Sequence, residues 1–223
     1  MRAPLRALAT LAVAAALVTG CGSGDDWSRP HPQPTAVGTL GPGFVDPAAP
    51  PGPEATATPR PGSWSGVHPP QGYRVVLLTA GDDGPTKALV KAVDEWAAAE
   101  HVDLRTVTAD SPSDYVAAAG RAMKMGADLI VSAGNDLIDP LAMITPNHLS
   151  QQFLVVGAEL AEPTQNVTAV DWPGASFRGE GLGMSSTYDP ASFTTARCEG
   201  AIRAGVAAVL SDMTGIVLWL DKV

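Results

Sequence analysis

Short apolar runs alternate with longer amphipathic segments over residues 72–223. The runs at 73–80 (YRVVLLTA) and 127–134 (ADLIVSAG) are continuous and rich in β-branched residues, which predicts strands buried on both faces. Apolar side chains within 86–100 recur every three or four residues, which predicts an amphipathic helix. The repeating unit of this region is therefore a strand followed by a helix.

The remaining elements extend the same alternation. Segment 101–109 (HVDLRTVTA) mixes apolar with charged residues, which predicts a strand at the edge of the sheet. Further strands are predicted at 152–159, 166–172 and 216–220. Further helices are predicted at 115–124 with Ser111 as its cap, from Asp139-Pro140 to Pro146, and around Ile202 to Leu210 with Gly215 as its stop. This order predicts an α/β fold with a doubly wound, mainly parallel sheet of five to six strands.

The N-terminal residues have the pattern of an export signal. Arg2 and Arg6 precede a short uncharged run at 7–18, too short to span a bilayer. The sequence Val18-Thr19-Gly20-Cys21 resembles a bacterial lipobox, which implies a signal peptide over 1–20 and a lipidated Cys21 at the mature N-terminus. The alternative is an ordinary secreted protein. The resemblance implies a lipid-anchored protein on the extracytoplasmic face of the cell membrane.

Residues 21–71 differ in composition from the rest of the chain. Twelve prolines lie between Gly22 and Gln71, with almost no apolar periodicity. Such a composition predicts a disordered, semi-extended tether that reaches on the order of 100 Å from the membrane. Its isolated Trp27, Phe44 and Trp64 are either docking points or solvated side chains, and we expect the latter.

Charge and cysteine content narrow the functional classes. The net charge is −9 for the whole chain and −9 − 2 = −11 without Arg2 and Arg6, which argues against nucleic acid and anionic lipid as partners. If Cys21 is acylated, Cys198 has no partner for a disulfide, and we expect it to be buried. The four histidines are widely spaced, so we expect no structural metal. We also expect no cofactor.

Candidate ligand-binding residues follow the predicted strands. In an open parallel sheet, ligands bind beyond the carboxyl ends of the strands, where glycines, helix N-termini and polar side chains meet. The candidates at these ends are Gly81, Asp82, Asp83, Gly134, Asn135, Asp136, Gly157, Glu159, Asp171 and Trp172. Each acid could instead be a helix cap or a solvated loop residue.

Several of these segments together resemble a known family. YRVVLLTAGDDG, MGADLIVSAGND, QFLVVGAELAEPTQNVTAVDW and AIRAGVAAVLSDMTGIV are similar to the N-terminal lobe of the basic membrane protein family. These are lipoprotein receptors of ABC importers, built on the type I periplasmic-binding fold, and several bind purine nucleosides. The resemblance implies a single lobe over 72–223, with the usual second lobe absent.

The chain also departs from the family pattern. The first strand is followed by Gly84-Pro85-Thr86 without the aromatic residue that stacks on a base, and Asn135 stands where a second aromatic is common. An extra segment at about 173–200 is predicted to be an inserted surface loop.

Two functions remain open at this stage. The first is a non-enzymatic solute-binding lipoprotein that holds a small polar ligand. It would work with an ABC permease, with a second copy, or with another chain that supplies the second lobe. The alternative is a protein-interaction module on the cell surface. Catalysis is not expected, because the sequence shows no Gly-x-Ser-x-Gly elbow and no Cys/His arrangement.

Overall fold

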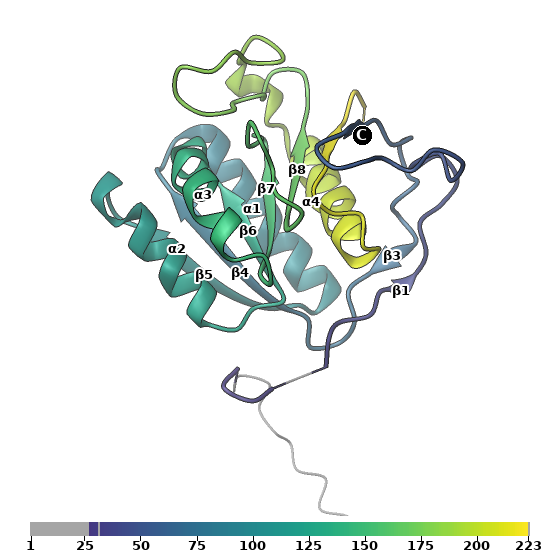
Figure 1. The fold of residues 1–223 in the computed structure, drawn as a ribbon, viewed down its shortest axis with the longest axis horizontal. Coiled ribbons are helices and arrows are strands. Elements are labelled where there is room, and N and C mark those ends of the chain that lie inside the picture. The colour runs from purple at the N-terminus through teal and green to yellow at the C-terminus, as the bar shows by residue number, and fades with distance from the viewer. Residues whose placement is uncertain (1–26, 31, 223) are drawn as a thin grey trace, which may run out of the picture.

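The structure is a computed structural model that describes residues 27–30 and 32–222. The predicted signal peptide and Cys21 lie outside the described residues. Seven parallel strands form one sheet in the order β2-β9-β8-β7-β6-β4-β5 (Figure 1). The strands are β2 (Thr56–Ala57), β4 (Arg74–Ala80), β5 (Asp103–Ala109), β6 (Leu129–Ala133), β7 (Gln152–Val156), β8 (Val167–Asp171) and β9 (Val217–Trp219).

Helices cover both faces of this sheet. One face packs against α1 (Gly84–Glu100) and α4 (Thr195–Leu210), and the other against α2 (Tyr115–Lys124) and α3 (Ile138–Ile144). Single 3-10 turns lie at Pro112–Asp114, Asn135–Leu137, Thr145–Asn147 and Pro190–Ser192. The predicted doubly wound α/β fold is therefore confirmed, and β5 is at the edge of the sheet as predicted.

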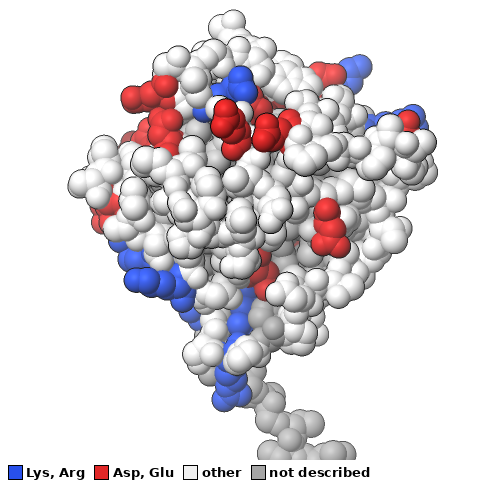
Figure 2. Space-filling view, viewed as in Figure 1, with Lys and Arg blue, Asp and Glu red and all other residues white. Residues whose placement is uncertain are grey.

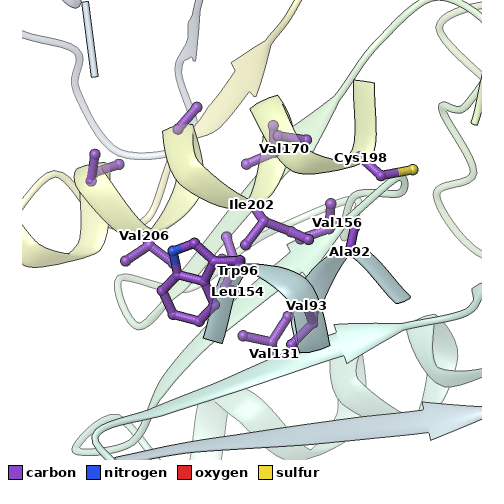
Figure 3. Packing of buried hydrophobic residues seen from close by; sticks show 14 of the residues in the cluster. Ala92, Val93, Trp96, Val131, Leu154, Val156, Val170, Cys198, Ile202 and Val206 are labelled. Carbon is purple, nitrogen blue, oxygen red and sulfur yellow. The ribbon is translucent and has the colours of Figure 1, made fainter. Parts of the chain in front are cut away.

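Apolar periodicity explains which helix faces are buried. Trp96 of α1 and Ile202 of α4 lie over Leu154 of β7 in the core of the first face (Figure 3). Cys198 is fully buried in the same cluster, as predicted for a thiol that behaves as a small apolar side chain. Burial raises the pKa of this thiol to about 11, so it is protonated and a poor nucleophile at neutral pH.

Several predicted boundaries are wrong. The third helix begins at Ile138, after the 3-10 turn, so Asp139-Pro140 lies inside its first turn. Ser111 precedes a 3-10 turn and makes no capping hydrogen bond with its side chain. The last helix ends at Leu210, whereas Gly215 has a φ of +71° just before β9. Because α4 already begins at Thr195, the insert comprises residues 173–194.

The expectation of a disordered tether is wrong for the described part of residues 21–71. Phe44 and Trp64 are buried in the core cluster of the first face, and Trp27 is buried on the second. The two residues of β2 extend the sheet beyond β9, which makes seven strands instead of the predicted five to six. Nearby, β1 (Val37–Gly38) pairs antiparallel with β3 (Val67–His68). Isolated aromatic side chains carry no periodicity, but each buries a large apolar area where the folded domain offers a matching surface.

We expect Phe44→Ala to lower the free energy of unfolding by about 3 kcal/mol, because a side chain that is 1% exposed leaves a cavity when truncated. Urea denaturation of the purified chain measures this loss. Val37→Ala is the matched control in the same segment, since Val37 is 54% exposed and its loss should cost little. Equal stability of the two variants would mean that this segment does not pack on the domain.

None of the helices in the described part of the chain combines the length and apolar character that crossing a membrane requires.

Candidate functional site

The carboxyl ends of β4 and β6 meet where α1 and α3 leave toward opposite faces of the sheet. Both Asp83 Oδ2 and Asp136 Oδ2 lie within 4 Å of the position that a Cβ on Gly81 would occupy, at 3.5 and 3.6 Å. The structure thus brings together three residues that the sequence placed at this crevice.

These acids nevertheless have structural partners. Asp83 caps α1, because its carboxylate accepts hydrogen bonds from the backbone N–H of Thr86 at 3.0 Å and from the Thr86 hydroxyl at 2.7 Å. Asp136 accepts a hydrogen bond of 2.8 Å from the Tyr115 hydroxyl. Asp82 is 98% exposed beside Lys87, and Asn135 opens the 3-10 turn before α3. Asp83 is therefore a helix cap and Asp82 is a solvated loop residue, the two alternatives to ligand binding that the sequence left open.

Two of the glycines predicted to leave room for a ligand instead leave room for other atoms of the protein. A Cβ on Gly134 would lie 2.6 Å from the Ala80 carbonyl oxygen, and a Cβ on Gly157 would lie 2.6 Å from the Phe193 ring. Phe193 belongs to the insert and packs edge-on against Trp172, with ring centroids 5.0 Å apart. Trp172 is fully buried and donates its indole N–H to Ser192 Oγ at 3.1 Å. The insert thus fills the crevice beyond β7 and β8, where the sequence placed a ligand.

Asp171 is fully buried at the end of β8. Its Oδ1 accepts hydrogen bonds from the backbone N–H groups of Trp172 at 2.8 Å and Ser176 at 2.7 Å, whereas Oδ2 has no partner among the described residues. Burial raises the pKa of this carboxyl to about 7; the two N–H groups lower the pKa, and the nearby Glu159 raises it further. Asp171 orders the start of the insert.

Glu159, one of the residues predicted to bind a ligand, lines a cavity in the structure. Its carboxylate pairs with Arg178 Nε at 2.8 Å and accepts a hydrogen bond from Ser185 Oγ at 3.2 Å. The Glu159 side chain is 8% exposed, and the Arg178 side chain is 36% exposed. Burial raises the pKa of Glu159, and Arg178 and Ser185 oppose that rise. A buried carboxylate is thus held beside a guanidinium that still reaches solvent.

Four separate segments build the cavity around this pair, which we call the edge cavity. It has a volume of about 310 Å³ and is lined by Glu54, Thr56, Glu159, Leu160, Ala161, Pro163, Arg178, Ser185, Val217 and Trp219. The N-terminal segment supplies Glu54, whose φ is +62°, and the insert supplies Arg178 and Ser185. Sequence reasoning missed Glu54, Arg178 and Ser185 because none of them lies in a helix or strand with a periodic apolar pattern. The sequence offered one weak signal, because Arg178 and Arg197 are the only basic residues of the segment 173–200 in which the insert was predicted.

A second cavity lies at the opposite, amino edge of the sheet. It has a volume of about 570 Å³, and its lining includes Tyr73, Asp128 and Gln152 together with residues 33–36 and 38–40. Gln152 Oε1 is buried there, and no described residue forms a hydrogen bond with it. Within residues 27–30 and 32–222, no group of three His, Cys, Asp or Glu side chains is arranged to hold a metal ion.

No protein-family model and no curated protein matches the chain. An ABC transporter solute-binding protein from Aeropyrum pernix K1 aligns with a TM-score of 0.41 and 23% identity, over 45% of this chain and 29% of that one. A putative lipoprotein fragment from Peptoclostridium difficile 630 aligns with a TM-score of 0.45 and 15% identity, over 62% and 98%. A transcriptional activator of the comK gene from Bacillus halodurans aligns with a TM-score of 0.40 and 14% identity, over 67% and 53%.

The chain thus spans less than a third of the length of the Aeropyrum protein. Each of these structures aligns with a TM-score below 0.5 and an identity below 25%, so none of them assigns this chain to a family or a role. Membership of the basic membrane protein family stays a prediction.

Proposed function

We propose that the chain is an extracytoplasmic lipoprotein, anchored through Cys21, that binds a small polar ligand in the edge cavity and catalyses no reaction. The observation that carries the binding role is the Glu159–Arg178 pair in a cavity of about 310 Å³. That volume is at the lower end of the range for small-molecule sites, roughly 300 to 1,000 Å³. The resemblance to a lipobox supports anchoring through Cys21. None of the described residues argues for or against an ABC permease as a partner.

The lining defines the chemistry of the ligand. Arg178 makes no hydrogen bond through its two terminal nitrogens to the described residues, so it can donate to an acidic group. Glu54 and Glu159 offer carboxylate oxygens to a cationic or hydroxyl group, and Trp219 offers a half-buried ring. A molecule of about amino-acid size that carries both an acidic and a donor group fits this lining best.

Calorimetric titration of the mature chain with amino acids, nucleosides and sugars tests the binding role. We expect saturable binding that Arg178→Gln weakens by about tenfold or more, because a charge-assisted hydrogen bond contributes about 1.5 to 3 kcal/mol. Gln152→Ala is the matched control, since Gln152 lines the other cavity and its Oε1 has no partner to lose. If none of these compounds binds, or if only Gln152→Ala weakens binding, the edge cavity is not the binding site.

Acylation is tested separately. Mass spectrometry of the mature protein should find a lipid-modified Cys21 at the N-terminus, and Cys21→Ser should move the protein from the membrane fraction to the medium. Without acylation the anchor is wrong, while binding in the edge cavity is unaffected.

A protein-interaction module is the second candidate function. Met143 of α3 and Leu182 and Met184 of the insert are 65%, 50% and 47% exposed. The insert is fixed to α3 by hydrogen bonds from the Glu180 N–H to both oxygens of Asp139, at 3.3 and 3.2 Å. Exposed apolar side chains on a fixed loop and its neighbouring helix favour contact with another protein. Loss of a cell-surface complex in a Met143→Lys variant that still binds ligand would favour this second role.

A further inference from the structure

Trp27 is docked at the amino edge of the sheet, where β4 and β5 begin. Its side chain is 6% exposed, and its indole N–H donates a hydrogen bond of 2.6 Å to Asp103 Oδ2. The guanidinium of Arg105 lies 4.3 Å from the indole centroid. Arg74 donates to the carbonyl oxygens of Trp27 at 3.4 Å and Arg29 at 3.0 Å. Trp27, the first residue that the structure describes, is therefore fixed to the domain.

The position of Trp27 in the sequence limits how far the domain can stand from a lipidated Cys21. Only five residues, 22–26, separate the two. A fully extended chain spans at most about 3.6 Å per residue, so six residue steps reach about 20 Å. The expected tether of about 100 Å requires a chain that is free up to residue 71. The docking of Trp27 removes most of that length.

We infer that the amino edge of the domain faces the membrane at close range and that the carboxyl edge, with the edge cavity and the insert, faces away from it. This inference rests on the proposed anchor at Cys21. Figure 1 shows residues 27–30 at the lower end of the domain and the insert at the upper end. The partner of the amino edge is thus a lipid surface, and a ligand reaches the edge cavity from the side opposite the bilayer.

The short length of chain between Cys21 and Trp27, and not the charge of the domain surface, sets this orientation. On the face shown in Figure 2, most acidic side chains lie in the upper half, whereas basic ones lie both in the upper half and at the lower end. Among the residues at the lower end, Arg29, Arg74 and Arg105 are accompanied by Asp103 and Asp128. Asp25 and Asp26 also directly precede Trp27 in the sequence. Because these charges offset each other, we expect the orientation to persist at high salt, which would screen an electrostatic attraction.

Energy transfer from two labelled positions to an acceptor lipid tests the orientation. The full acylated protein is reconstituted in phosphatidylcholine vesicles, with a donor on Lys124→Cys or on Asp82→Cys; buried Cys198 does not compete for the label. Lys124 is two residues from Gly126, whose added Cβ would lie 3.8 Å from the Trp27 carbonyl oxygen, and Asp82 follows the far end of β4. We expect the Lys124 donor to lie closer to the bilayer by about 20 Å, the length of a seven-residue strand.

Trp27→Ala should reduce this difference, because it removes the hydrogen bond to Asp103 and the contact with Arg105 and leaves the Arg29 carbonyl with its hydrogen bond from Arg74. Val37→Ala keeps its backbone pairing and should leave the difference intact. Equal transfer from the two positions in the acylated protein would overturn the orientation alone. An unmodified Cys21 would overturn both the orientation and the proposed anchor, and mass spectrometry of the same sample separates these two results.

Discussion

Replacing Gly134 by alanine should lower the free energy of unfolding by about 4 kcal/mol. Gly134 has φ = +111° and ψ = 138°, a region that residues with a Cβ essentially do not occupy. The added Cβ would also stand 2.6 Å from the Ala80 carbonyl oxygen and 3.3 Å from the Thr86 hydroxyl. Backbone strain and a clash with the Ala80 carbonyl oxygen therefore act together.

Gly84→Ala is the matched control for this variant. Gly84 opens α1 with an ordinary backbone conformation, and no atom lies within 4 Å of its added Cβ, so alanine there should be neutral or slightly stabilising. Urea denaturation followed by circular dichroism compares the two variants with the parent. A Gly134→Ala variant as stable as Gly84→Ala would show that β4 and β6 do not approach each other as described.

The Gly134 result also bears on what the sequence could predict about the site. Topology correctly placed Gly134 at the carboxyl edge beside Gly81, because parallel strands end at one edge. The same rule cannot distinguish a glycine that admits a ligand from one that admits the neighbouring backbone. Asp83 shows the same limit, since a carboxylate at a strand end is also the usual cap of the following helix.

The fold itself was accessible to sequence reasoning where burial is continuous. Strands such as β4 are apolar on both faces, and α2 was predicted from Tyr115 to Lys124 because its alanines and larger apolar residues recur at helical spacing. Periodicity says nothing about segments that fold by isolated contacts. Phe44 is buried between elements that are far away in the sequence, so its surroundings exist only after the domain has folded.

The edge cavity escaped prediction for the same reason. Glu54 comes from a proline-rich segment, Arg178 from the insert and Trp219 from the last strand, and only the folded chain brings them together. Glu159 was found because it follows a strand, but its partner Arg178 could be paired with it only in the structure. The backbone N–H of Glu159 also donates to the Phe177 carbonyl oxygen at 2.9 Å, which fixes the insert against the end of β7.

The contribution of Asp171 to the stability of the chain should fall as the pH rises from about 4 to about 7. The folded-state pKa of this carboxyl is about 7, whereas an unfolded aspartate has a pKa of about 3.9, so the folded chain holds one more proton between these values. Stability decreases with pH wherever the folded state binds more protons. At about 1.4 kcal/mol per pH unit, the loss over this window is on the order of 4 kcal/mol, and it levels off above pH 7.

Asp171→Asn should remove this loss. An asparagine keeps an oxygen that accepts the N–H groups of Trp172 and Ser176, and it cannot ionise. We therefore expect the variant to match the parent near pH 4 and to be more stable by a few kcal/mol at pH 8, as measured by urea denaturation at both values. Asp82→Asn, at a position that is 98% exposed, should leave the pH dependence of the parent unchanged. A parent chain that gains stability between pH 4 and pH 7 relative to Asp171→Asn would mean that the Asp171 carboxyl is ionised in the folded state, with its charge stabilised by the two N–H groups.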